Sequence, residues 1–164
     1  MKFPERVYTE EEVKTAKELI AKGYKHSLTV EGSPNFKEQV NRALELIRTA
    51  GAYEFLRTCI KRIIEIDGIT QLRETEAVIW ANKFAVENPV DAASLLVQKA
   101  NHMKEYLAGE LYYGGAAEKR SIEKRKEFLE LLQNKSEDKN VKEECERLLQ
   151  MWEGKRASLL ATQP

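Results

Sequence analysis

One segment, residues 33–47, constrains the fold more than any other because it carries every signal of an amphipathic helix. Ser33 is suited to cap a helix, and Pro34 follows at the first helical position, where its missing N–H costs nothing. The apolar residues that follow are Phe36, Val40, Ala43, Leu44 and Ile47. Their spacing of i, i+4, i+7, i+8 and i+11 places them on one helical face. The chain must therefore have a core into which that face packs.

Capping signals predict three more helices, and apolar residues at helical spacing predict a fourth over residues 116–134. Thr9 and Glu12 match a capping box, in which each side chain accepts a hydrogen bond from the other's backbone N–H. Asn88 is followed by proline and repeats the cap-and-proline start. Ser136 is the expected cap of the last helix. The predicted helices cover residues 10–22, 89–108, 116–134 and 136–152.

The sequence pattern in the middle of the chain predicts secondary structure less clearly. Residues 27–31 alternate apolar and polar side chains, which predicts a short strand. A third helix is predicted up to Asp67-Gly68 from one apolar face: Tyr53, Leu56, Ile60, Ile63 and Ile64. Residues 72–86 fit either a helical face or a strand whose side chains alternate, and both interpretations stay open.

These elements predict an α+β fold that is predominantly helical. A small β element would be formed by residues 27–31 and 75–82, which would pair beside the helix over 89–108. If residues 72–86 are helical instead, the fold is an all-α bundle. A chain of 164 residues fits one globular domain, which we expect over residues 1–153. Residues 154–164 have few apolar anchors and are expected to form a poorly ordered tail.

Composition excludes several classes of protein. The 27 basic and 27 acidic residues cancel, so the chain lacks the basic excess of a general nucleic-acid binder. No apolar run is long enough for a membrane span, and the N-terminal residues lack the apolar region of a secretory signal. Cys59 and Cys145 lie on apolar helical faces, as free thiols in a cytoplasmic protein do. No nucleotide-binding or serine-hydrolase motif occurs, so we expect no cofactor.

The candidate site lies within the predicted helix over 89–108. Gln98, Lys99 and His102 occupy the frame in which a zinc peptidase carries His-Glu-x-x-His. Spacing i, i+4 places two imidazoles on one helical face, and the glutamate acts as general base on a metal-bound water. Of these three positions, only that of His102 carries the residue that the motif requires.

With the blocks "SPNFKEQVNRALELI" and "AVIWANKFAV" before it, this segment resembles small bacterial zincin-type metallopeptidase domains. In such domains a strand precedes the active-site helix, and a loop and a glutamate-bearing helix follow it. The resemblance covers roughly residues 28–134. It implies that His102 matches the second ligand histidine, that Gln98 replaces the first, and that Lys99 replaces the general base.

The resemblance also implies a third zinc ligand from the following helix, Glu118 or Glu123, with Glu123 better placed. Two departures from the motif remove a zinc ligand and the general base. The amide of Gln98 is a poor zinc ligand beside imidazole, and Lys99 is a cation with no acceptor. We therefore expect a catalytically inactive zincin-like domain that holds no metal and keeps its cleft for binding a peptide or protein.

The loop between the two helices carries Tyr112 and Tyr113, which are candidates for lining that cleft. Two other hypotheses stay open. The chain could be a helical protein-interaction module unrelated to peptidases, with an exposed apolar patch that binds a partner helix or a second copy in a homo-oligomer. It could also be an enzyme whose site is not recognisable, near Glu118 and Glu123. Nucleic-acid binding through residues 119–126 is disfavoured because glutamates interrupt the basic side chains.

Overall fold

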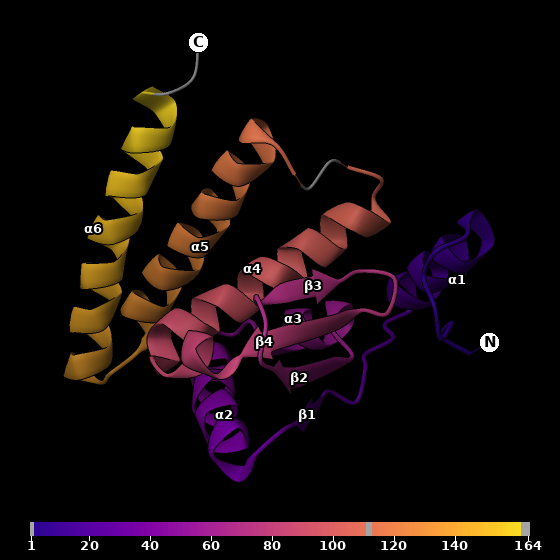
Figure 1. Cartoon of the computed structure of the whole chain (residues 1–164), viewed down its shortest axis with the longest axis horizontal. Helices are drawn as coiled ribbons and strands as arrows, with labels where there is room; N and C mark the ends of the chain where they lie inside the picture. Colours follow the sequence, from indigo (N-terminus) through magenta and orange to yellow (C-terminus); the bar gives the residue numbers. More distant parts are fainter. Residues whose placement is uncertain (1, 111–112, 162–164) are drawn as a thin grey trace.

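The computed structural model describes residues 2–110 and 113–161, with side chains up to residue 158. A four-stranded sheet and six α-helices in the described part confirm the predominantly helical α+β fold (Figure 1). The elements are α1 (Glu10–Ala21), β1 (Thr29–Glu31), α2 (Pro34–Thr49), α3 (Tyr53–Cys59), β2 (Arg62–Ile66), β3 (Gln71–Arg73), β4 (Val78–Asn82), the 3₁₀ helix η1 (Lys83–Val86), α4 (Pro89–Leu107), α5 (Gly115–Lys135) and α6 (Lys139–Ala161). None of the described helices is both long and apolar enough to cross a bilayer.

The sheet has the strand order β1-β2-β4-β3. β1 pairs with β2 and β2 pairs with β4, both in parallel, whereas β3 pairs antiparallel with β4. The segments 27–31 and 75–82 both contribute strands, as one interpretation predicted. They do not pair with each other, however, because β2 lies between them.

The helix predicted through Ile60 and Ile64 is the main error of the sequence interpretation. α3 ends at Cys59, and β2 begins at Arg62. The run Arg62–Ile66 is rich in β-branched side chains, which favour a strand, and parallel partners on both sides satisfy its backbone groups. Residues 72–86 form β3, β4 and η1, so the all-α alternative is wrong.

One side chain fastens the end of β4. Asn82 Nδ2 donates to the carbonyl oxygens of Asp67, at 3.1 Å, and Gly68, at 2.9 Å. Its Oδ1 accepts from the N–H of Phe84 at 2.9 Å and so caps η1. The loop that carries the chain from β2 to β3 is thereby held against the end of β4.

The helices behave largely as their local signals predicted. The capping box of α1, the caps of α2 and α4, and the buried apolar face of α2 are all present. The cap of α6 differs: Asp138 Oδ1 accepts from the N–H groups of Asn140, at 2.8 Å, and Val141, at 3.2 Å. Ser136 instead accepts from the Asp138 N–H. α6 continues to Ala161, so the boundary expected at residue 153 does not coincide with a helix end.

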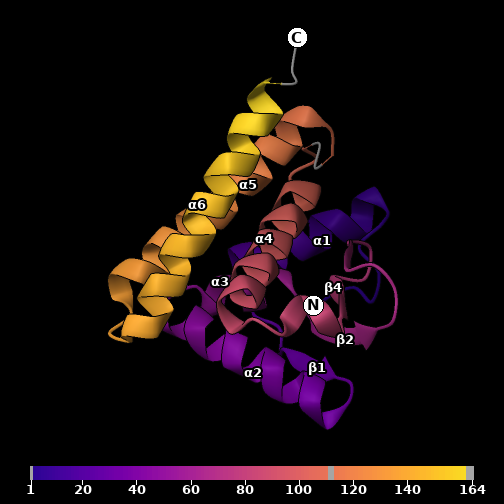
Figure 2. The same cartoon turned by 60° about the vertical axis from the view of Figure 1, so that its left-hand side comes forward.

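α4 is the central helix of the molecule. It lies between the sheet on one side and the adjacent helices α5 and α6 on the other (Figures 1 and 2). α2 and α3 also pack against it, and its buried positions include Leu96, Ala100 and Met103. α1 lies at the opposite end of the molecule from α6 (Figure 1). The packing of α4 against these elements therefore fixes the position of the side chains on its α5-facing side.

Candidate functional site

The three residues in the peptidase frame lie on the half-buried side of α4 that faces α5. Gln98, Lys99 and His102 are all intermediate in exposure. Asn88 caps the first turn of the helix that carries them, with its Oδ1 accepting from the N–H groups of Val90 and Asp91. The frame predicted from the sequence is thus one continuous helical surface.

Ser121 of α5 joins the two ends of that frame. Its Oγ accepts a hydrogen bond from Gln98 Nε2 and lies 3.1 Å from His102 Nε2. Both side chains that would have stood as zinc ligands are therefore hydrogen-bonded to a serine. Sequence reasoning did not single out Ser121, since only the register between α4 and α5 brings it to this place.

Arg125, one turn further along α5, completes the set of contacts. It is 6% exposed, and its Nη2 lies 2.8 Å from Asp91 Oδ1. Nε donates to Ser94 Oγ at 3.0 Å, and Nη1 donates to Gln98 Oε1 at 3.4 Å. Burial lowers the pKa of Arg125, and the Asp91 carboxylate opposes that effect. We call Ser94, Gln98, His102, Ser121 and Arg125 the α4–α5 network.

The electrostatics around this network are unfavourable for a cation. Burial lowers the pKa of Lys99, and the charge of Arg125 lowers it further. Burial also lowers the pKa of His102 to about 4, with smaller contributions from Lys99 and Arg120. Neighbouring positive charge therefore acts on both titratable groups of the frame.

Neither candidate for the third ligand is bonded to the network. Glu123 forms an ion pair with Arg156 of α6, with Oε1 2.5 Å from Nε. Glu118 is exposed in the first turn of α5, where a carboxylate interacts favourably with the helix dipole. Tyr113 is 67% exposed, and Tyr112 lies outside the described residues.

The donor set does not fit a zinc ion. Gln98 donates with its amide nitrogen and accepts from a guanidinium with its amide oxygen. In the described part of the chain, no three His, Cys, Asp or Glu side chains are grouped as metal ligands. No step of zinc chemistry can be assigned to these residues.

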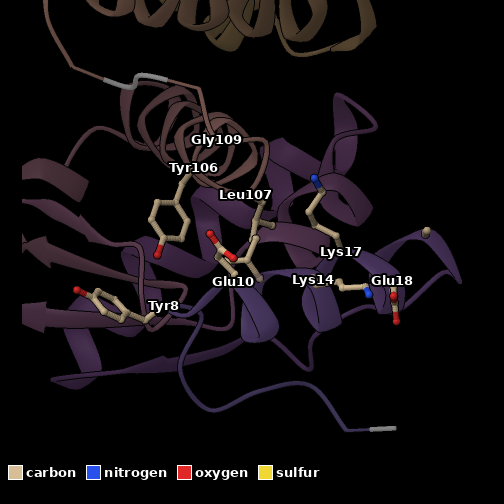
Figure 3. A pocket seen from close by; sticks show the side chains of 10 residues that line it. Tyr8, Glu10, Lys14, Lys17, Glu18, Tyr106, Leu107 and Gly109 are labelled. Carbon is tan, nitrogen blue, oxygen red and sulfur yellow. The ribbon is translucent and has the colours of Figure 1, made fainter.

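A separate surface groove lies beside the same helix. A groove of about 660 Å³ runs between α1 and the C-terminal end of α4 (Figure 3). Val13, Ala21 and Leu107 give it an apolar lining, and Tyr8 and Tyr106 stand together at one end. We call it the α1–α4 groove. Its volume is within the range of small-ligand and peptide sites.

The rim of the α1–α4 groove carries both signs of charge. Glu10, Lys14, Lys17 and Glu18 line it along α1. At the other wall, Tyr106 Oη donates to the carbonyl oxygen of Val7 and so ties the N-terminal segment to α4. The groove thus combines an apolar floor, a charged rim and a wall fixed by a hydrogen bond.

Comparisons with protein-family models, with curated proteins and with solved structures found no match to this chain.

Proposed function

We propose that this chain is a non-catalytic, zincin-like domain that binds a peptide or a segment of another protein in the α1–α4 groove. The observation that carries the proposal is the groove itself, which begins on α4 at Tyr106, one helical turn beyond His102. A surface of this kind can hold a peptide without any metal or general base.

The order of elements supports the relation to zincins. β4 precedes α4 with only η1 between them, and a loop and the glutamate-bearing helix α5 follow. The contacts within the α4–α5 network support the non-catalytic half. Gln98 and His102 are engaged by Ser121, and the base position is held by Lys99, which has no acceptor.

The lining of the groove indicates the kind of segment that fits. Val13 and Leu107 suit an apolar side chain, while Glu10 and Lys17 suit flanking charges of opposite sign. Seven residues separate Glu10 from Lys17, which is about 10 Å along a helix axis. About three residues of extended chain span that distance. The expected occupant is a short apolar stretch with a basic residue at one end and an acidic residue at the other.

The test is selection from a phage-displayed library of random twelve-residue peptides, followed by fluorescence anisotropy with the enriched peptides. Val13→Glu places a carboxylate in the apolar part of the groove, and we expect it to weaken binding at least ten-fold. Leu131→Glu makes the same kind of change on the exposed side of α5 and should leave binding unchanged. Circular dichroism melts would establish that both variants are folded.

Two results would contradict the proposal. Enriched peptides that bind the Val13→Glu variant as tightly as the unaltered protein would remove the groove from the function. Cleavage of unstructured peptides by the zinc-treated protein, abolished by a chelator, would refute the non-catalytic assignment while leaving the binding groove untouched.

A further inference from the structure

A second groove, of about 470 Å³, lies beside the N-terminal segment. Its lining residues are Lys2, Phe3, Glu5, Tyr24, His26 and Lys61. None of them lines the α1–α4 groove, so the two sites are distinct. We call this the His26 groove, and its volume is again that of a small-molecule site.

His26 is the unusual member of this lining. The residue is 2% exposed, and its Nε2 has no hydrogen-bond partner among the described residues. The main chain around it is well fastened, because the His26 N–H donates to the Arg57 carbonyl and Arg57 Nε donates to the His26 carbonyl, both at 2.9 Å. A buried polar atom without a hydrogen-bond partner lowers the stability of the fold, and His26 Nε2 is such an atom.

Two aromatic rings hold the imidazole. Phe3 and Tyr24 meet it edge to face, with ring centroids 4.5 Å and 5.0 Å away. The same two rings stack on each other at 5.0 Å. The apolar part of the groove is therefore built from flat aromatic surfaces, which suit a flat ligand.

The charges in the lining favour an anion. Lys2 is exposed and Lys61 is half-buried, and no ion pair joins either lysine to another described side chain. Glu5 is the one carboxylate of the lining, against these two ammonium groups. The lining thus carries two ammonium groups against one carboxylate, an excess of one positive charge.

We propose that the His26 groove binds a carboxylate that carries an aromatic ring. The ammonium groups of Lys61 and Lys2 donate to the carboxylate oxygens and balance their charge. The ring of the ligand packs against Phe3 and Tyr24. This chemistry is shared by small aryl carboxylates and by the C-terminus of a peptide that ends in phenylalanine.

The experiment is a ¹H–¹⁵N NMR titration of the full chain at pH 7 with benzoate, N-acetyl-phenylalaninate and benzamide. Benzamide has the shape of benzoate without the charge. We expect saturable shifts confined to the amides around Phe3, His26 and Lys61 for at least one carboxylate, and at least ten-fold weaker binding of benzamide. The tighter of the two carboxylates identifies the source of the ligand, and equal affinities mean that the ring and carboxylate are the whole recognised unit.

Two variants localise the effect. Lys61→Met keeps the alkyl chain and removes the charge, and it should weaken carboxylate binding at least ten-fold while leaving benzamide unchanged. Lys25→Met removes a neighbouring charge outside the lining and should have no effect. Saturation with the carboxylate should also raise the pKa of His26 from its value of about 4, because the anion stabilises the imidazolium.

Three results would overturn this proposal. The first is the absence of saturable shifts with either carboxylate. The second is equal binding of benzoate and benzamide. The third is carboxylate binding that survives Lys61→Met. None of these outcomes bears on the α1–α4 groove.

Discussion

His26 and His102 are the two histidines of the chain, and their surroundings differ: His26 is buried and His102 is half-buried. His102 lies in a polar interface between two helices, where its Nε2 is 3.1 Å from Ser121 Oγ. His26 lies among aromatic rings, and its Nε2 has no partner among the described residues. Burial lowers the pKa of both to about 4. The two sites therefore agree in charge state at neutral pH and differ in what their hydrogen-bonding groups do.

The two sites differ in whether their hydrogen-bonding groups are satisfied within the protein. The α4–α5 network satisfies its own donors and acceptors, so it stabilises the packing of α5 on α4. In the His26 groove, by contrast, Nε2 has no hydrogen-bond partner among the described residues, and the two lysines of the lining outnumber its one carboxylate. The sequence spacing pointed to His102, whereas the ligand site that we propose lies at His26.

The largest expected effect is in the α4–α5 network. Replacing Arg125 with Met should lower the free energy of unfolding by about 3 kcal/mol, because Asp91 loses its buried ionic partner and three further hydrogen bonds disappear. Urea unfolding at pH 7 measures this. Arg42→Met breaks an ion pair between two exposed side chains and should cost less than about 0.5 kcal/mol. A similar loss for both variants would show that the network contributes no more than a surface pair.

The next effect is the pH dependence that both histidines share. A folded-state pKa below the unfolded value means that the unfolded chain binds more protons, so stability falls as pH decreases from about 6.5 to about 4. Between pH 7 and pH 5 each histidine should cost about 2 kcal/mol of stability.

Unfolding of the unaltered protein, His26→Phe and His102→Gln across this range tests that expectation. Each variant should lose one histidine's share of the decrease. A variant whose stability falls as steeply as that of the unaltered protein would show that the replaced histidine is already protonated or exposed.

Removing the shared serine should have a moderate effect. Ser121→Ala leaves Gln98 Nε2 and His102 Nε2 without their partner, and we expect a loss of about 1–2 kcal/mol in the free energy of unfolding. Ser27→Ala, at an exposed position, is the control and should change stability by less than about 0.5 kcal/mol. If the two alanine variants unfold alike, Ser121 does not hold the network together.

The smallest effect distinguishes the two histidines most sharply. His26→Phe removes a buried polar atom that has no partner, so thermal unfolding at pH 7 should show a change within about 1 kcal/mol, in either direction. The same replacement at position 102 removes a contact with Ser121 and should be clearly destabilising. Destabilisation of His26→Phe by more than about 2 kcal/mol would indicate that its ring nitrogens are satisfied in solution.

How far the sequence predicts this molecule depends on how local each determinant is. The face of α2 and the caps Thr9, Ser33 and Asn88 were predicted correctly because residues within one or two turns decide them. The strand at Arg62–Ile66 was not, since its apolar residues fit both a helical and an extended period. The choice between them comes from partners in β1 and β4.

The candidate site shows the same limit. Gln98, Lys99 and His102 could be placed on one face of one helix from spacing alone. That Ser121 and Arg125 meet them follows from the packing register of α5 on α4, which no local pattern encodes. His26 could not be selected either, because its significance lies in a missing partner, and only coordinates reveal that.

The strand order also governs the sequence of events when the chain folds. β1 and β2 pair although 33 residues separate Val30 from Ile63, so a long loop must close before this part of the sheet is stabilised. α5 and α6 are neighbours in the chain and pack after closing only a short turn. We expect the α5–α6 pair to form in the earliest kinetic phase and the parallel strand pairing to set the overall folding rate. Mutations that destabilise β2 should then slow refolding. Mutations between α5 and α6 should also slow refolding and change the unfolding rate little, because their contacts form before the rate-limiting step.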